Sequence, residues 1–196
     1  VSRESINLKE YILKKTSSIR KDSFVRKIER EIYDPDGVIL EQIKASAAGQ
    51  LPKGFDPSNF YPARQHPKAL QMTVFGMSDA IGQLGFNWEE VQEKVNPDEV
   101  SVFSGAAIGQ LDNFGFGGLM QSRIKGSRAS SKNLALGLVE MSADFINAYV
   151  LGNVGRTGHS VGACATFLYN LQMGKEAIES GSSKVSIVGA AEAPIA

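Results

Sequence analysis

The chain has 196 residues, a length typical of one domain or of one domain and part of another. Apolar residues make up 42% of it and charged residues 21%, as in globular proteins that bury a core. The 21 basic and 21 acidic residues balance, so charge does not favour nucleic acid or a membrane surface as a partner. The single cysteine excludes an internal disulfide and fits a reducing compartment, which predicts a cytoplasmic protein.

Both ends of the sequence have the character of cut ends. The chain begins without methionine or a signal-peptide pattern, and it stops at Pro194-Ile195-Ala196, directly after an apolar strand pattern. We therefore expect a fragment of a longer protein. No apolar run reaches the roughly 18–20 residues of a membrane span, because Glu140 and Asp144 interrupt the longest candidate, 133–152. No membrane segment is expected.

The N-terminal part carries few structural signals. Asn7 and Glu10 have the spacing of a capping box at the start of a short helix. Residues 19–32 are strongly basic with apolar positions on one face, which predicts a helix with solvated charges. A Pro-Asp-Gly turn at 34–37 precedes a predicted strand over 39–51.

The pattern then becomes helical. Residues 54–67 read as a loop, and the following apolar positions share one helical face that ends before Gly85, a predicted C-terminal cap. Those positions are Leu70, Val74, Met77, Ile81 and Leu84. A second capping box, Asn87 with Glu90, predicts a short helix to about Lys94.

From residue 100 onward, predicted strands and helices alternate. A strand over 100–103 leads into a glycine-rich loop, 105–118, and then a polar basic connection. A helix is predicted from Ser142 to Leu151, a second after the cysteine to about Ser180, and a strand over 184–190. This alternation indicates an α/β fold with layers of helices and sheet.

Cys164 lies in a stretch of small residues, 157–166. A short apolar run before it predicts a buried strand, and a helical pattern follows through Phe167, Leu168, Leu171 and Ile178. Free N–H groups at a helix start, with the helix dipole, stabilise a thiolate and also the oxyanion of a thioester carbonyl. Position alone leaves two interpretations open, a nucleophile and an ordinary buried cysteine.

The remaining candidate groups are weaker. The glycine-rich loop lacks the Gly-Lys-Ser/Thr ending and the helix-opening Gly-x-Gly-x-x-Gly of phosphate sites, which favours close approach to a substrate or a partner subunit. His159 precedes Cys164 by five residues, and strand alternation would place the two on opposite faces, so a Cys–His pair is disfavoured. His66, beside Pro67, is predicted as a surface or capping residue. No cluster has metal-ligand spacing, so no metal is expected.

Two segments together carry a family resemblance. Val161-Gly162-Ala163-Cys164-Ala165-Thr166, followed by a helix and then the strand 185–193 ending in Gly-Ala-Ala-Glu-Ala, resembles the active-site region of the β-ketoacyl-[acyl carrier protein] synthases. The loop 105–109 and the passage 51–57 are also similar to segments of that family. The resemblance covers roughly residues 40–196.

The resemblance implies the N-terminal half of a thiolase-like layered α/β/α fold over 41–196, with 1–40 as an inserted or lineage-specific segment. It implies acyl transfer to Cys164, whose backbone N–H forms half of an oxyanion hole, and then decarboxylative condensation with a malonyl thioester in fatty-acid biosynthesis. By the same resemblance, the acyl pocket is lined by Ile108, Met141 and Ala163, and the carrier protein docks on Lys125 and Arg128.

The family also implies a homodimer, an acyl carrier protein as partner, and substrates carried as phosphopantetheine thioesters with no bound cofactor. Its two catalytic histidines and the other half of its oxyanion hole lie in the second half of the fold, so the isolated chain is expected to be inactive in condensation. Two alternatives remain open: a thiolase or polyketide-type condensing enzyme, and a non-catalytic synthase-like dimer partner.

Overall fold

A computed structural model describes residues 51–152 and 154–193. The chain divides into two units, Val1–Asp56 and Pro57–Ala196, and all the elements below belong to the second. The predicted capping box at Asn7, the helix over 19–32, the turn at 34–37 and nearly all of the strand over 39–51 lie outside the described residues. The same holds for the proposed segment 1–40, so its boundary stays a prediction.

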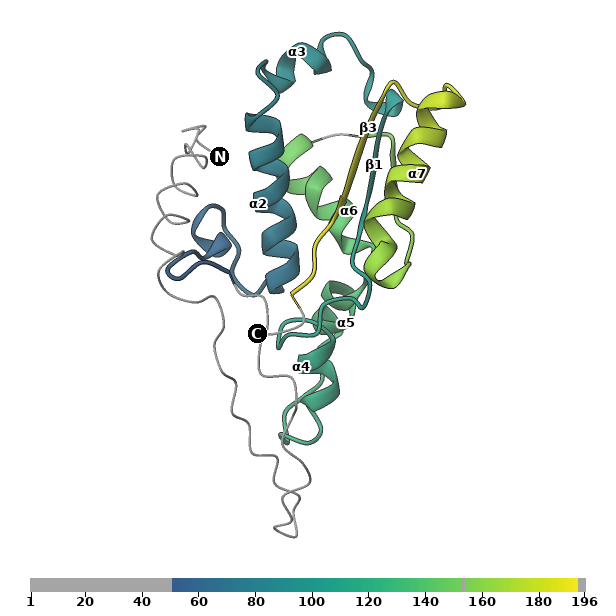
Figure 1. Ribbon diagram of the computed structural model, residues 1–196. Helices are drawn as coiled ribbons and strands as arrows, with labels where there is room; N and C mark the ends of the chain where they lie inside the picture. Colours follow the sequence, from purple (N-terminus) through teal and green to yellow (C-terminus); the bar gives the residue numbers. More distant parts are fainter. Residues whose placement is uncertain (1–50, 153, 194–196) are drawn as a thin grey trace, which may run out of the picture. The chain divides into compact units, whose positions relative to one another are not determined.

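The described elements follow one another in α/β order (Figure 1). Short 3-10 turns are η1 (Pro57–Asn59), η2 (Pro97–Glu99) and η4 (Ala163–Ala165). The helices are α2 (Lys68–Gly82), α3 (Trp88–Gln92), α4 (Phe116–Gln121), α5 (Ser131–Gly137), α6 (Met141–Ile146), its π-helical continuation η3 (Asn147–Leu151), and α7 (Thr166–Glu179). The strands are β1 (Val100–Gly105), β2 (Arg156–Gly158) and β3 (Val185–Ala190).

The three strands form a parallel sheet in the order β2-β1-β3. Every residue of the central strand β1 is buried, as expected for a parallel strand covered on both faces. Helix α7 packs against β1 and β3, while α6 packs against β1 and β2 and carries α2 on its outer side (Figure 1). This arrangement confirms the predicted layered α/β/α fold.

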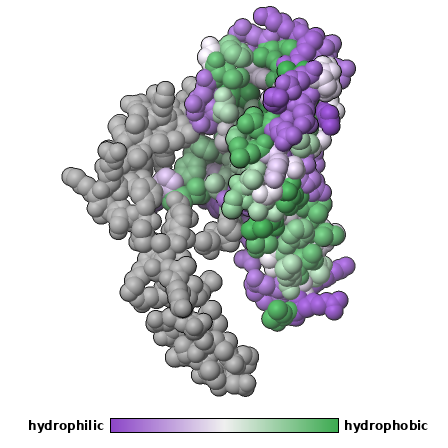
Figure 2. All heavy atoms as spheres, turned by 45° about the vertical axis from the view of Figure 1, so that its right-hand side comes forward, coloured by the Kyte–Doolittle hydropathy of each residue, from purple (hydrophilic) through white to green (hydrophobic). Residues whose placement is uncertain are grey.

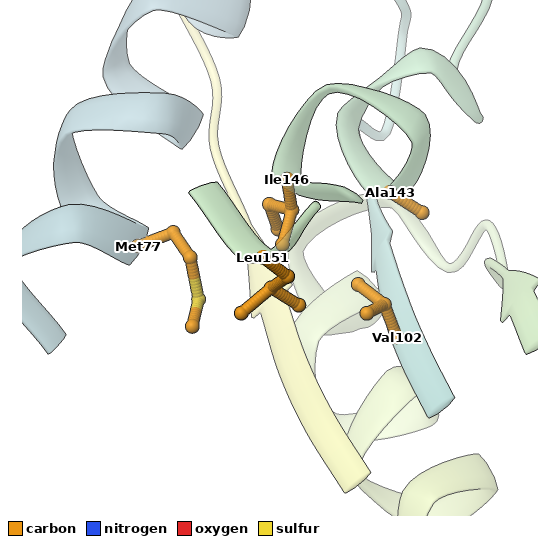
Figure 3. Close-up of a cluster of buried hydrophobic side chains, with 5 residues drawn as sticks. All are labelled: Met77, Val102, Ala143, Ile146 and Leu151. Atoms are coloured by element: carbon orange, nitrogen blue, oxygen red, sulfur yellow. The ribbon is translucent and has the colours of Figure 1, made fainter. Parts of the chain in front are cut away.

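One apolar cluster joins the sheet to the helices α2 and α6. It contains Met77 of α2, Val102 of β1, Ala143 and Ile146 of α6, and Leu151 at the end of η3, all at most 8% exposed (Figure 3). A second cluster joins α2 to α5 and α6 through Leu70, Val74, Leu136 and Phe145. Burial of these side chains, at about 1.5–3 kcal/mol each, is the main force holding α2 and α6 in place.

Several predicted elements are confirmed. Helix α2 carries its apolar positions inward, although it ends at Gly82, so Leu84 lies beyond it and is 41% exposed. The capping box of α3 forms, with the Glu90 carboxylate accepting from the Asn87 backbone N–H at 3.3 Å. Helix α6 with η3, helix α7 and strand β3 occupy their predicted positions, and Gly152 ends η3 in the left-handed conformation.

Two predictions in this region are wrong, and the buried face of α7 was not predicted. The stretch read as a loop and basic connection contains the helices α4 and α5. The apolar run before the cysteine belongs to η3, and the actual strand is the short polar β2. In α7, the buried positions are Thr166, Asn170, Gly174 and Ala177.

The large apolar residues of α7 therefore face outward. Phe167, Leu168, Leu171 and Ile178 are between 44% and 62% exposed. Figure 2, turned to bring the α7 side of Figure 1 forward, shows hydrophobic side chains gathered on this surface. The small inward stripe lets the helix approach closely, since a Cβ at Gly174 would lie 2.7 Å from Val188 Cγ1 of β3.

The glycine-rich loop folds tightly on its own backbone. A Cβ at Gly117 or Gly118 would lie 1.9 Å from a carbonyl oxygen of the same loop, so neither position accepts a side chain. Asp112 in this loop caps the distant helix α2, because its Oδ2 accepts from the Lys68 backbone N–H at 2.6 Å. The glycines thus serve the loop's own fold, and the loop anchors α2.

Membrane-spanning potential is low throughout the described ranges 51–152 and 154–193. No single helix there has the length and apolar character to cross a bilayer, and only the sharply bent pair Ser131–Gly137 and Met141–Leu151, taken together, meets those two criteria.

Candidate active site

Cys164 lies in the middle of the η4 turn, directly before α7. Its side chain is exposed in this chain and carries a free thiol, which favours the nucleophile interpretation over an ordinary buried cysteine. The preceding residue, Ala163, has φ of 48°, a left-handed conformation that is rare for a residue with a side chain. Such local strain persists only where the surroundings hold it, and it is common at functional sites.

Thr166 holds this strained turn. Its side chain is 2% exposed, and its Oγ1 accepts from the Gly162 backbone N–H at 3.1 Å. The same hydroxyl donates to the Ala163 carbonyl at 2.8 Å. The turn that presents the thiol is therefore closed by the first residue of the helix that follows it.

The carboxyl ends of the strands meet around this turn. Gly158 of β2 lies beside Phe103, and Ala190 of β3 lies beside Gly105, the last residue of β1. The His159 Cβ lies 2.9 Å from the position that a Cβ on Gly105 would occupy. In open α/β sheets, ligands bind at this end of the strands, so the thiol has the position expected of a reacting group.

The glycine-rich loop borders the same end of the sheet. The Ala106 backbone N–H donates to the Val139 carbonyl and that of Gln110 to the Gly137 carbonyl, at 3.3 and 3.1 Å. Ile108 lies between these two bonded residues and is 49% exposed. Met141, two residues beyond Val139, packs half-buried on the second apolar cluster.

The proposed acyl-pocket residues are thus brought together in part. Ala163 adjoins Cys164 in the η4 turn, and the loop bonds bring Ile108 beside the segment that leads into Met141. No described contact joins either of these two side chains to Cys164, so their role in a pocket stays a prediction.

Glu192 follows the end of β3 and reaches the glycine-rich loop. Its Oε1 accepts from the Ala107 backbone N–H, while its Oε2 is buried without a hydrogen-bond partner. The Gly-Ala-Ala-Glu segment therefore has a structural role. It fastens the loop that carries Ile108 to the strand that leaves the site.

The two predicted docking residues lie on the surface. Lys125 and Arg128 are exposed in the connection between α4 and α5, together with Arg123. The neighbouring Met120 and Ile124 are 72% and 87% exposed. No described ion pair neutralises these cations, and residues 113–139 contain no acidic residue.

The two histidines differ in their surroundings. No hydrogen bond joins the His159 ring to Cys164 in the described part of the chain, in line with the expectation that they do not pair. His66, predicted as a surface or capping residue, is half-buried, and its carbonyl accepts from Gln71 Nε2 of α2 at 2.8 Å. Its Nδ1 lies 3.2 Å from the Tyr61 hydroxyl and its Nε2 3.4 Å from the Tyr149 hydroxyl. Burial, and secondarily the charge of Lys132, lower the pKa of His66 below 6.5.

Within the described residues, no group of three or more His, Cys, Asp or Glu side chains converges to hold a metal ion. What the site offers is a solvent-exposed thiol at the start of a 14-residue helix, held in a strained turn at the carboxyl end of a parallel sheet. That arrangement suits a nucleophile that attacks an acyl group and a backbone that stabilises the resulting oxyanion.

Asn170 is a site residue that the sequence did not reveal. It is fully buried on α7 and bonds to the backbone on either side of the site, at Ser160 and Gly189. The available signal was its position four residues after Thr166, on the same helix face, within an otherwise small-residue stripe.

Comparisons with known proteins show the family to which the chain belongs. Residues 4–196 match the family model described as beta-ketoacyl synthase, N-terminal domain. Over 153 residues the chain is 56% identical to the beta-ketoacyl-[acyl-carrier-protein] synthase FabY of Pseudomonas aeruginosa, covering 78% of this chain and 24% of that protein. It is 23% identical over 163 residues to the fatty acid synthase subunit alpha of Saccharomyces cerevisiae, covering 81% of this chain and 8% of that protein.

The described fold also has a close structural counterpart. The crystal structure of the ketosynthase FabY from P. aeruginosa superposes with a TM-score of 0.74 at 57% sequence identity, covering 76% of this chain and 23% of that one. The chain therefore spans about a quarter of the length of this relative.

Proposed function

Because the chain belongs to the β-ketoacyl synthase family as an N-terminal domain, we propose that it supplies the nucleophile of a condensing enzyme of fatty-acid biosynthesis. The observation that carries the proposal is the exposed Cys164 thiol in a strained turn at the start of α7. An accessible thiol beside a residue in the left-handed conformation is more typical of a functional site than of a cysteine with only a packing role.

The first step is acyl transfer. The Cys164 thiolate attacks the carbonyl carbon of an acyl thioester, a new carbon–sulfur bond forms, and the carrier thiolate leaves and takes up a proton. Backbone N–H groups at the start of α7 stabilise the oxyanion of the tetrahedral intermediate. The product is an acyl-enzyme in which the acyl group is a thioester of Cys164.

The second step is condensation. A malonyl thioester loses carbon dioxide, and the resulting carbanion attacks the acyl-enzyme carbonyl, releasing a β-ketoacyl thioester and the free Cys164 thiol. In the family, histidines in the second half of the fold stabilise the enolate, and this chain spans about a quarter of the length of FabY. We therefore propose that the 196-residue chain undergoes acylation but does not condense by itself.

Lys125 and Arg128 are proposed to dock an acidic acyl carrier protein. Their support is the uncompensated positive charge of the connection between α4 and α5, beside the exposed Met120 and Ile124. Opposite charges steer association, so the docking rate depends on these cations and on salt. A homodimer, a cytoplasmic location and the absence of a bound cofactor also belong to the proposal.

The test measures condensation in the complete enzyme that contains this chain, with malonyl or acetyl thioesters as the second substrate, free or on carrier protein. We expect condensation with the malonyl thioester, loss of activity in Cys164→Ala, and weaker use of carrier-protein substrates in a Lys125→Glu, Arg128→Glu variant. Condensation of two acetyl thioesters would indicate a thiolase instead. Full activity in Cys164→Ala would refute the proposal, and a complete enzyme that forms no acyl adduct would support a non-catalytic dimer partner.

A further inference from the structure

Asn170 makes two hydrogen bonds that acyl transfer itself does not require. Its side chain is 0% exposed. Its Oδ1 accepts from the Ser160 backbone N–H at 2.8 Å, and its Nδ2 donates to the Gly189 carbonyl at 2.9 Å. A single side-chain amide therefore joins α7 to the segment before Cys164 and to the carboxyl end of β3.

The segment that Asn170 holds has little other support. Residues 159–162 lie between β2 and η4 and form no regular secondary structure. Thr166 closes the turn at Gly162 and Ala163, so its bonds act only within the turn. Among the described hydrogen bonds, the pair at Asn170 is what connects this segment to the edge of the sheet.

Helix formation does not explain why position 170 carries an asparagine. Asparagine is a weak helix former, and burying its amide costs free energy unless both ends are bonded. A leucine would suit a buried helix position better. Both ends of the amide are bonded here, and the partners lie 10 and 19 residues away in the chain. The amide is therefore suited to joining two distant backbone segments at fixed spacing.

We propose that Asn170 is a positioning residue for Cys164. By holding Ser160 at a fixed distance from Gly189, it sets where the η4 turn presents the thiol relative to the carboxyl end of the sheet. This inference rests on the proposed role of Cys164 as the nucleophile. Since Asn170 lies beneath the turn and is fully buried, it acts on the geometry of attack and leaves substrate affinity unchanged.

The main test compares the variants Asn170→Leu and Ser101→Ala with the wild-type chain. It measures single-turnover acylation by an acyl-CoA, detected as the increase in intact-protein mass. Asn170→Leu keeps a similar volume and removes both hydrogen bonds. We expect its rate constant at saturating acyl-CoA to fall roughly 10- to 100-fold, because small misplacements of a reacting group have effects of that size. The half-saturating acyl-CoA concentration should stay at the wild-type value.

The matched control is Ser101→Ala. It removes another buried side-chain hydrogen bond involving β3, from the Ser101 hydroxyl to Ser186 at 3.1 Å, which lies away from the turn. We expect it to acylate at the wild-type rate. Equal slowing in both variants would mean that any buried bond to β3 matters, and a change confined to the half-saturating concentration would indicate a binding role. Either result overturns the proposal.

Two measurements do not depend on enzymatic function. In the wild type, the hydrogen of the Ser160 backbone amide should exchange with solvent as slowly as the interior amides of α7. Exchange at the rate of an exposed loop would overturn the proposal even if Asn170→Leu fails to fold.

The second measurement is alkylation of the thiol. Iodoacetamide should alkylate Cys164 more slowly in Asn170→Leu than in wild type. If acyl-CoA labels no variant but alkylation still separates them, the proposed function fails and the positioning role stands; equal alkylation refutes the positioning role.

Discussion

Single residues define the character of the turn that carries the thiol. Ala163 adopts the left-handed conformation, Thr166 bonds the backbone on both sides of it, and Cys164 is left exposed between them. A left-handed non-glycine residue costs about 1–3 kcal/mol, which the two Thr166 hydrogen bonds, at about 1 kcal/mol each, offset in large part. The conformation that exposes the Cys164 sulfur atom therefore lowers the stability of the fold slightly.

His66 shows a second use of individual side chains. Its ring lies between the hydroxyls of Tyr61 and Tyr149 and packs edge-on against Phe145 at a centroid distance of 5.0 Å. Lys132 faces the same group and adds positive charge. These surroundings favour the neutral imidazole over the protonated form, which lowers the pKa of His66.

The stability of the fold should therefore depend on His66 as pH falls. Its pKa is lowered in the folded state from an ordinary value of 6.5, so the folded form binds the proton less readily than the unfolded form. The stabilisation is complete above the unfolded pKa and is lost as pH falls through the folded pKa. Urea unfolding should show the stability difference between wild type and His66→Gln shrinking from about pH 7.5 to about pH 5.5, one unit either side of the reference pKa. A difference that does not change with pH would contradict this account.

The sequence predicted some of these single-residue features and missed others. Small residues around Cys164 and the helical pattern after it correctly placed the thiol in a turn before a helix, and its role as nucleophile stays a proposal. The role of Asn170 could not be predicted, because its partners at Ser160 and Gly189 become neighbours only when α7 packs on the sheet. A long-range side-chain bond leaves no mark in local spacing.

At the scale of elements, helix α2 depends on a cap supplied by a distant loop. The residue before the helix, Pro67, has no side chain that can cap the helix. Asp112 caps it instead, because its carboxylate accepts from the Lys68 backbone N–H. The same carboxylate accepts from the Phe114 N–H at 2.8 Å, so the cap and the loop fold together. Carboxylates at helix N-termini also interact favourably with the helix dipole.

Replacing Asp112 by alanine should therefore destabilise the fold by about 1–2 kcal/mol, as for loss of a helix cap. Chemical unfolding measures the change. The control is Asp79→Ala, which removes an exposed bond from Gln83 within α2 itself and should cost about 0.5 kcal/mol or less. Equal effects of the two substitutions would rule out the cap.

The elements were predictable where local pattern decides them. The apolar stripe of α2 and the capping box of α3 are signals of that kind. Helix α4 was missed because its sequence begins Phe-Gly-Gly, and it forms through loop bonds such as Phe116 N–H to the Gln110 carbonyl at 2.7 Å. Strand β2 was missed because its three residues are polar, and pairing with β1 alone makes it a strand.

The sequence predicted helix α7 without indicating which of its faces packs on the sheet. That face carries small and polar residues. Gly174 allows close approach to β3, and Asn170 bonds to the segment before the turn and to the end of β3. Close packing and hydrogen bonding therefore fix the face of α7 that meets the sheet.

At the scale of the whole molecule, the alternation of strands and helices predicted a layered fold, and the parallel sheet β2-β1-β3 confirms it. The fold brings three strand ends, the glycine-rich loop and the start of α7 to one place. Glu192 and Asn170 then join the end of β3 to the two loops beside the thiol. We propose that this assembly presents Cys164 to an acyl thioester.

The most direct test locates the covalent intermediate. The full chain is incubated with an acyl-CoA, digested at acidic pH and mapped by peptide mass spectrometry, with Cys164→Ala treated in parallel. We expect one acyl group on the peptide that contains Cys164 and none on the variant. An unmodified Cys164 in a folded chain, or the same acyl mass retained in Cys164→Ala, would contradict it.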